Sequence, residues 1–330
     1  MYDDTKWGND MYLREVSQTK PALGGNTTLA FVTNMDDYES KILFSKLWDR
    51  LFRFERRFSR FLPLSELSSF NRSAGLKTPV SPDFLEMLRI AKQLSITTSG
   101  LFNPFIMPAL QRAGYVKSAM TGHEDDQQTN YSDRVVVGIE ELEIGDNWAR
   151  IPFRTALDFG GFGKGYIANQ LASILDSSNI QGYWLSLSGD IITKGHDEDG
   201  NKIYIDIQDA NSLGKTGNWV IECFDEHCGI ATSGTFRRAG QNTKDPWHHI
   251  IDPSTMKPAK TDIRLATICT NNTLMADVMA SCAVILGSEK APAFLKSHGV
   301  ESALLQCIDK NGVTFEKSFG NKIRQKVLNA

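Results

Sequence analysis

Four glycines fall within six positions of the segment DFGGFGKGY, residues 158–166. The residues after it place apolar side chains at the three- and four-residue spacing of one helix face, at Ile167, Leu171, Ile174 and Leu175. We expect a short strand over residues 149–158, so the glycines would join a strand to a helix. Such a connection lets backbone amides approach an anion, and the helix N-terminus also favours negative charge. An ordinary tight turn is the alternative, because neither the Walker pattern nor G-x-G-x-x-G is matched.

The preceding half of the chain predicts two further helices. Asp36 or Asp37 can cap a long helix with apolar positions at Leu43, Leu47, Leu51, Phe54 and Phe58. Arginines crowd the end of that helix, at positions 50, 53, 56, 57 and 60, and they predict either a solvated face or a phosphate-facing rim. Ser81-Pro82-Asp83 is a second helix start. A glycine turn at residues 24–25 leads into a strand that ends near residue 32.

The following half mixes strands and helices without strict alternation. Strands are expected at residues 135–144, 183–187, 203–208, 220–224 and 265–270, and a closing hairpin at residues 302–317 around Asn311-Gly312. An apolar helix over residues 275–286 should end at Gly287, with another helix near residues 291–297. The fold class predicted from these patterns is α+β. Residues 1–21 are expected to form a polar lead, and residues 22–330 one domain.

Composition excludes several classes of protein. Apolar residues make up 41% of the 330 and charged residues 23%, which is ordinary for a globular domain and unlike a disordered chain. The net charge of −3 gives no bulk positive field for nucleic acid or anionic lipid. No uninterrupted apolar run is long enough for a transmembrane segment. Five cysteines form no CxxC motif, and a Cys223–Cys228 bridge is left open.

Two further groups of residues have the chemistry of a site. Asp277 and Ser281 lie four residues apart on the apolar helix, which puts a carboxylate and a hydroxyl on one face. Such oxygen donors suit Mg²⁺, although an aspartate early in a helix is often a cap. Adjacent His248 and His249 would point to opposite faces of a strand, so we expect one of them to face a site as acid, base or phosphate donor, with a surface pair as the alternative.

These segments together resemble the ApbE-type flavin transferases, also called FAD:protein FMN transferases. The resemblance covers about residues 22–320. It is carried by FERRFSRFLPLSELSSFN at 54–71, TSGLFNPFIMPAL at 98–110, DFGGFGKGY at 158–166, SGD at 188–190, ATSGTFR at 231–237, HIIDP at 249–253 and ADVMASCAVILG at 276–287.

The resemblance implies an enzyme that binds FAD with Mg²⁺, attaches the FMN half through a phosphoester to a threonine of an acceptor protein, and releases AMP. It implies one unit of two interlocked α/β halves, related to the T-fold, with FAD in the groove between them. It places the metal on Asp277, Ser281 and a backbone carbonyl at Gly161, and the assisting histidine at His249. The flavin contacts map onto Phe61, Leu101, Phe102, Asn103, Asp158 and Lys164. The acceptor would be a subunit of a flavin-dependent redox pump or reductase.

This sequence departs from the family pattern at three places. Ser281 replaces the usual threonine and keeps its hydroxyl, and Ser188 replaces the first glycine of the usual G-G-D. Family members usually carry an export signal with a lipid-anchor cysteine, whereas the opening residues here are polar, so the compartment is left open. Two alternative functions also stay open: an FAD pyrophosphatase that gives FMN and AMP, and a flavin-binding protein without catalysis.

Overall fold

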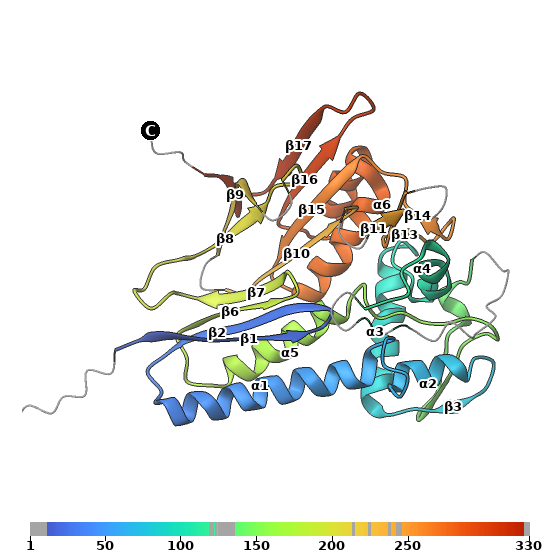
Figure 1. Ribbon diagram of the computed structural model, residues 1–330, viewed down its shortest axis with the longest axis horizontal. Coiled ribbons are helices and arrows are strands. Elements are labelled where there is room, and N and C mark those ends of the chain that lie inside the picture. Colours follow the sequence, from blue (N-terminus) through green and yellow to red (C-terminus); the bar gives the residue numbers. More distant parts are fainter. Residues whose placement is uncertain are drawn as a thin grey trace, which may run out of the picture.

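An eight-stranded antiparallel sheet runs through the molecule in the order β1-β2-β6-β7-β10-β15-β16-β17 (Figure 1). The computed structural model describes residues 12–118, 122, 124, 136–212, 215–223, 226–236, 239–241 and 246–326. The strands of this sheet are β1 (Arg14–Ala22), β2 (Gly25–Thr33), β6 (Gly182–Leu187), β7 (Asp190–Gly195), β10 (Cys228–Gly234), β15 (Ile263–Thr270), β16 (Ser302–Ile308) and β17 (Thr314–Phe319).

Within the described part of the chain, four smaller sheets accompany it. The sheet β18-β9-β8 consists of β18 (Ile323–Gln325), β9 (Thr216–Cys223) and β8 (Ile203–Gln208). The sheet β3-β5-β4 consists of β3 (Thr78–Pro79), β5 (Trp148–Arg150) and β4 (Glu143–Ile144). Two short hairpins pair β11 (Ala239–Gln241) with β12 (Pro246–His248), and β13 (Ile251–Asp252) with β14 (Lys257–Pro258).

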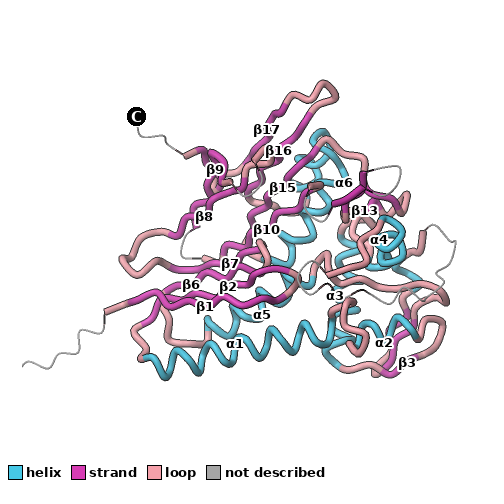
Figure 2. Tube along the Cα trace, viewed as in Figure 1, coloured by secondary structure: helices cyan, strands magenta, loops and turns pink. Residues whose placement is uncertain are grey.

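The helices form two groups on this framework (Figure 2). The first group is α1 (Asp37–Phe58), α2 (Glu66–Arg72), α3 (Pro82–Thr97), α4 (Met107–Ala113) and α5 (Gly163–Asp176), with the 3-10 turns η1 (Pro104–Ile106) and η2 (Ile139–Glu141). The second is α6 (Thr273–Ser297), which packs on β10 and β15 and also touches α5. The mixed α+β class predicted from the sequence is confirmed.

Two of the hydrophobic cores lie between helices and the eight-stranded sheet. In the first, α1 packs on β2 through Phe44 and Phe31, α5 packs on β6 and β7, and Phe84 of α3 packs on Phe58 at the end of α1. In the second, small side chains such as Ala276 and Ala280 let α6 approach β10 and β15 closely. We call the parts of the molecule around the first and the second core its two halves. The two halves share one continuous sheet, and each has its own core.

Helix ends follow the sequence signals closely. The Asp36 side chain caps α1 and forms a capping box with Glu39, and Ser81 caps α3 with Pro82 at its first position. The two predicted helices at the C-terminal side form one element, α6, which kinks at Gly287 where φ is +76°. Asp262 accepts hydrogen bonds from the amide and the hydroxyl of Ser288 and so caps the second part of the helix.

Helix α6 is also long and apolar enough to cross a membrane, and it is the one such helix among the described residues. Half of the residues in the apolar window are buried inside the protein. Since α6 packs on β10 and β15, its apolar character is that of a core helix.

Parts of the fold differ from the sequence-based expectations. Of the strand expected over 149–158, only β5 forms; beyond it the backbone is irregular, and the Asn71 side chain accepts from the amide of Leu157 in place of a strand partner. Residues 136–142, expected as strand, are coil and η2. Residues 14–21, expected within the polar lead, form β1 together with Ala22, and this strand pairs with β2 along its whole length. Residues 135, 224 and 237 lie outside the described residues, as does most of the polar loop at 118–134.

The cysteines are all free and buried. Cys223 and Cys228 are not bridged, and the sulfur of Cys228 lies 3.2 Å from that of Cys269. These thiols contribute to the core between β9, β10 and β15.

Candidate active site

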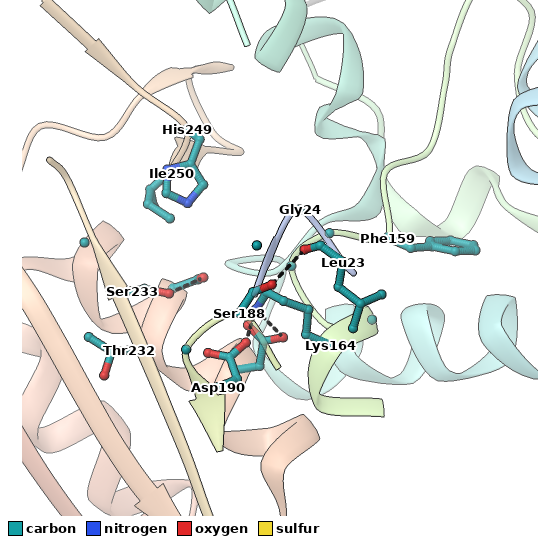
Figure 3. A pocket seen from close by; sticks show the side chains of 18 of the residues that line it. Leu23, Gly24, Phe159, Lys164, Ser188, Asp190, Thr232, Ser233, His249 and Ile250 are labelled. Carbon is teal, nitrogen blue, oxygen red and sulfur yellow. Dashed lines mark hydrogen bonds and ion pairs between the residues drawn. The ribbon is translucent and has the colours of Figure 1, made fainter. Parts of the chain in front are cut away.

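A pocket of about 890 Å³ lies where residues of both halves meet (Figure 3). Strand β7 pairs with β10 only along Cys228–Ile230, whereas β10 continues beside β15 to Gly234. The sheet therefore opens between the start of β7 and the end of β10. This opening places Asp190, at the start of β7, and Ser233, near the end of β10, in the pocket wall.

The glycine loop enters the pocket immediately before α5. Helix α5 begins at Gly163, and no side chain caps it. A Cβ at position 165 would lie 2.5 Å from the carbonyl oxygen of Thr273, so Gly165 allows α5 and α6 to pack backbone to backbone. Gly160, Gly161 and Gly163 line the pocket. The loop thus combines an open approach to a ligand with a tight helix contact, and it follows irregular backbone where a strand was expected.

A buried ionic cluster follows from that helix contact. Lys164 lies between the carboxylates of Asp190 and Asp277: it forms an ion pair with Asp190, and its ammonium is 3.5 Å from Oδ2 of Asp277. The amide of Gly165 also donates to Asp277, at 3.3 Å. The two carboxylate side chains are each only 5% exposed, and that of Lys164 is 15% exposed. One ammonium is thus shared by two carboxylates in a setting where water screens charge poorly.

Asp277 is not the cap of its helix. Asn272 caps α6, accepting from the amide of Met275, and Asp277 lies one turn further along. Ser281, the next residue on this face, lines the same pocket, and its hydroxyl oxygen lies 3.0 Å from that of Ser233. The carboxylate and hydroxyl predicted to share a helix face are therefore both presented to the pocket.

These donors fit Mg²⁺ better than a transition metal. Among the described residues no three His, Cys, Asp or Glu side chains converge as a metal-binding group. Mg²⁺ commonly takes one or two protein carboxylates and completes its coordination with water and substrate phosphate. Asp277, Ser281 and Gly161 all line the pocket, and a carboxylate, a hydroxyl and a backbone carbonyl could supply hard oxygen donors of that kind. The pocket also contains Lys164, and lysine is a residue suited to binding phosphate.

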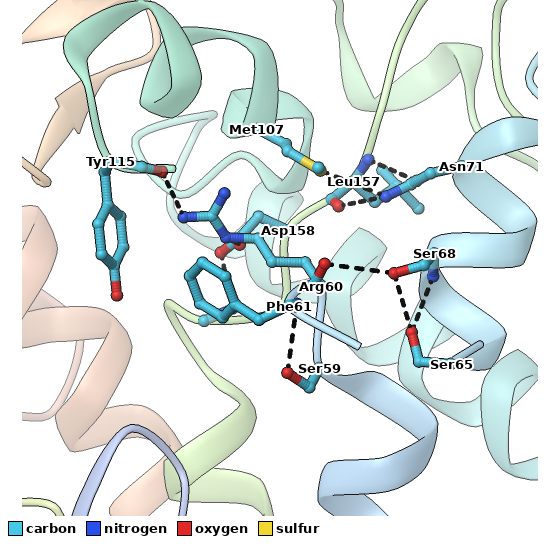
Figure 4. Close-up of polar contacts among 11 residues, drawn as sticks. Ser59, Arg60, Phe61, Ser65, Ser68, Asn71, Met107, Tyr115, Leu157 and Asp158 are labelled. Carbon is cyan, nitrogen blue, oxygen red and sulfur yellow. Dashed lines mark hydrogen bonds and ion pairs between the residues drawn. The ribbon is translucent and has the colours of Figure 1, made fainter. Parts of the chain in front are cut away.

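A second buried ion pair lies in the same wall (Figure 4). Arg60 donates to Asp158 at 2.9 Å and to the carbonyl of Tyr115 at 2.8 Å. Its guanidinium lies over the rings of Phe61 and Tyr115, 4.3 and 4.7 Å from their centroids. Asp158 also accepts from the amide of Gly160 at 2.7 Å, which ties this pair to the glycine loop. Arg60 is buried, so for this residue the expectation of a solvated face is wrong, and Arg60 lines the pocket.

Aromatic and apolar side chains form the adjoining wall. Phe61, Leu101, Phe102 and Asn103 all line the pocket. Phe102 packs edge-on against Phe162, with ring centroids 5.5 Å apart. Asn103 holds the wall in place, because its side chain accepts from the amide of Phe105 and donates to the carbonyl of Val137, both at 2.9 Å. A flat aromatic ligand would find offset or edge-on partners here.

The two adjacent histidines have different surroundings. His249 lines the pocket, and its ring lies edge-on to Tyr115 with centroids 6.1 Å apart. His248 instead contacts the carbonyl of Ala259 through Nε2, at 3.0 Å, and burial lowers its pKa. Of the two histidines, His249 is the one among the described residues that line the pocket.

Sequence reasoning missed several pocket residues. Tyr115 carries no local signal, and Asp190 lies in the quoted SGD motif without an assigned role. Glu55 accepts from the amide of Leu23 at 2.8 Å, and burial raises its pKa. The Ser188 hydroxyl donates to the carbonyls of Ala22 and Leu23, so it joins the β6–β7 turn to the β1–β2 turn (Figure 3). These contacts depend on tertiary packing that no spacing encodes.

Known proteins share this architecture. A flavinyl transferase ApbE from Pseudomonas stutzeri has a similar structure, with a TM-score of 0.78, 22% identity, and coverage of 93% of this chain and 95% of that one. The flavin transferase ApbE from Vibrio cholerae matches with a TM-score of 0.74 and 25% identity, over 93% of this chain and 97% of that one. An FAD:protein FMN transferase from Haemophilus influenzae is 24% identical over 268 residues, which are 79% of this chain and 77% of that protein. The sequence model of the ApbE family matches residues 24–304. The chain belongs to the ApbE family.

Proposed function

We propose that this protein transfers FMN from FAD to a threonine of an acceptor protein, in a Mg²⁺-dependent reaction that releases AMP. The observation that carries the proposal is that one pocket combines an aromatic wall, a buried lysine–carboxylate cluster and a histidine. Relatives with the same architecture are named flavin transferases. The acceptor class proposed is a subunit of a redox pump or reductase that carries a threonine flavinylation motif.

Binding is assigned to the aromatic wall and the glycine loop. Phe61, Leu101 and Phe102 would contact the flavin ring system, with Asn103 and Asp158 keeping that wall in shape through the hydrogen bonds described above. Lys164 would turn toward the pyrophosphate, where its ammonium neutralises charge on the transferring group. Phosphoryl transfer needs mainly positioning and charge stabilisation from a protein, and these residues supply both.

The metal is assigned to Asp277, Ser281 and the carbonyl of Gly161. When bound there, Mg²⁺ supplies Lewis-acid stabilisation of the phosphate oxygens. Asp277 is kept in place before metal binding by the amide of Gly165 and by Lys164. These contacts pre-orient one ligand and leave the hydroxyl of Ser281 one helical turn away.

His249 is assigned as the base. In the proposed step the threonine oxygen attacks the phosphorus of the FMN half, the bond to the bridging oxygen breaks, AMP leaves with that oxygen, and His249 takes the proton of the threonine. General-base catalysis of this kind contributes about 10²–10⁴-fold. His249→Ala should therefore slow transfer by that factor at saturating FAD, and a wild-type rate would remove His249 from the mechanism.

The deciding experiment incubates the protein with FAD, Mg²⁺ and an acceptor protein bearing a threonine flavinylation motif. Flavin fluorescence on the acceptor in a denaturing gel and free AMP are measured together, with a threonine-to-valine acceptor as control. A fluorescent band that the control lacks, with equimolar AMP, is the expected result. AMP without a band would indicate the pyrophosphatase reaction with water as the acceptor. Bound FAD with neither product would indicate a flavin-binding protein and refute the transferase.

A further inference from the structure

The Ser233 hydroxyl contacts Ser281, one of the residues proposed above to hold the metal. Its oxygen lies 3.0 Å from that of Ser281, and either hydroxyl can donate to the other. Ser233 sits opposite Ala266 in the pairing of β10 with β15. The next residue is fixed as well, because a Cβ on Gly234 would lie 2.5 Å from the carbonyl oxygen of Arg264. The strand therefore holds the Ser233 side chain at a set distance from α6.

Metal binding by Ser281 would determine which of the two serine hydroxyls donates the hydrogen bond. A serine that binds a cation uses a lone pair of its oxygen, so its proton must point away from the metal toward an acceptor. A serine side chain also has three staggered χ1 positions, and it lacks the β-branch that limits threonine. Without a fixed acceptor, Ser281 would have to give up that rotational freedom each time it bound a metal ion.

We propose that Ser233 is a positioning residue for Ser281. It accepts a hydrogen bond from the Ser281 hydroxyl, and this bond keeps a lone pair of the Ser281 oxygen directed toward the side of the pocket where Asp277 lies. This inference rests on the proposed function, because it presupposes a metal ion at Asp277 and Ser281. In this proposal the ATSGTFR segment does not contact the metal itself; it acts on the metal ligand Ser281 through Ser233. Partners of metal ligands commonly change metal affinity by 10–100-fold when they are removed.

The first test measures Mn²⁺ binding by the whole chain, from the loss of the free-ion electron paramagnetic resonance signal. Ser233→Ala should weaken Mn²⁺ binding about 10–100-fold. It should raise the Mg²⁺ concentration for half-maximal FMN transfer by a similar factor. Ser173→Ala, which removes a hydroxyl on the exposed part of α5, is the matched control and should bind as the wild type does.

The second test separates positioning from a general structural effect. In the Ser233→Ala background, Ser281→Thr should recover most of the lost affinity, because the β-branch of threonine restricts χ1 without help from position 233. In a double-mutant cycle, Ser233→Ala should cost nothing further once Ser281 is alanine. Thermal unfolding followed by circular dichroism establishes that each variant is folded.

The outcomes separate this inference from the function on which it rests. If Asp277→Asn abolishes Mn²⁺ binding but Ser233→Ala binds as the wild type does, the positioning role is wrong and the metal site stands. If Ser281→Thr gives no recovery, Ser233 acts by another route and the inference is likewise overturned. If the wild type binds no Mn²⁺ and Asp277→Asn changes nothing, both the metal assignment and this inference fail.

Discussion

Two buried ion pairs lie in the wall of one pocket, and they differ in how their charges are balanced. Arg60 and Asp158 carry opposite unit charges, with side chains 3% and 8% exposed. Lys164 is shared by Asp190 and Asp277, so at ordinary ionisation that cluster carries one positive and two negative charges. The Arg60–Asp158 pair is neutral, and we call it the closed pair. The Lys164 cluster retains negative charge beside the proposed phosphate position.

This difference indicates what each cluster is for. The Arg60 guanidinium is covered by two rings and donates to a carboxylate and a carbonyl, an arrangement that fixes the wall of the pocket. The excess carboxylate of the Lys164 cluster is a feature that a divalent cation can complete. We therefore expect substitutions in the first cluster to act mainly on stability, and substitutions in the second to act mainly on metal and phosphate chemistry.

The largest expected effect is on stability, from Arg60→Met. Methionine leaves Asp158 as a buried charge without its partner, and breaking a buried pair on one side costs about 3–5 kcal/mol. Urea unfolding followed by circular dichroism would measure the change. Arg53→Met is the control, since the Arg53 side chain is 69% exposed and its pair with Asp49 should contribute little. A loss below about 1 kcal/mol for Arg60→Met would contradict a structural role for the closed pair.

Asp277→Asn should act on turnover. The amide keeps the size of the side chain but removes the negative charge offered to Mg²⁺, so we expect FMN transfer to fall by about 10²–10³-fold, equivalent to about 3–4 kcal/mol. The measurement is the transfer rate as a function of Mg²⁺ concentration. Asp158→Asn is the informative comparison, because it should leave the Mg²⁺ midpoint in place even where it weakens FAD binding. If Asp277→Asn and Asp158→Asn shifted the Mg²⁺ midpoint equally, the two clusters would not differ in their effect on metal binding, contrary to this prediction.

Much of the fold was predictable because local signals determine it. The aspartate cap of α1, the serine cap and proline of α3, the bounds of β8, and the break at Gly287 all follow from residues within a few positions of each other. Strand β1 was not predictable in this way. Its side chains alternate between partly and fully exposed, and none before Ala22 is buried, so the hydrophobic alternation that identifies a strand is absent.

Residues of the candidate site were predictable only where they belong to a recognisable sequence motif. The spacing of Asp277 and Ser281 and the glycine loop could be found from the sequence, and resemblance supplied the aromatic wall. Arg60 could not be distinguished from four neighbouring arginines, because its burial depends on Tyr115 and Asp158, far away along the chain. The same holds for Ser233, whose partner is 48 residues away.

Lys164→Met tests whether the ammonium compensates the two carboxylates before metal binds. Methionine retains most of the apolar stem, so the main loss is the charged contact, and without metal the protein should lose about 1.5–3 kcal/mol. Added Mg²⁺ should restore part of that loss, because it binds the folded state. Urea unfolding with EDTA and with excess MgCl₂ gives the comparison.

The control for that experiment is Lys194→Met on β7, whose pair with Asp176 is partly exposed. It should cost under 1 kcal/mol in both conditions. If Lys164→Met cost the same with and without Mg²⁺, the lysine would be a structural partner like Arg60, and the contrast between the two clusters would be lost.

The smallest expected effect concerns the turn that precedes Asp190. Ser188 has a φ of +55°, and its hydroxyl donates to the carbonyls of Ala22 and Leu23. Ser188→Ala keeps the unfavourable φ and removes the hydroxyl, so it should cost about 0.5–1.5 kcal/mol in urea unfolding. Ser188→Gly also loses the hydroxyl but relieves the backbone, and should therefore be more stable than the alanine variant by about 0.4–1 kcal/mol. The reverse order would mean that the turn is not strained. A cost above about 2 kcal/mol for alanine would mean that the Ser188 hydroxyl stabilises the two turns by more than a neutral hydrogen bond provides.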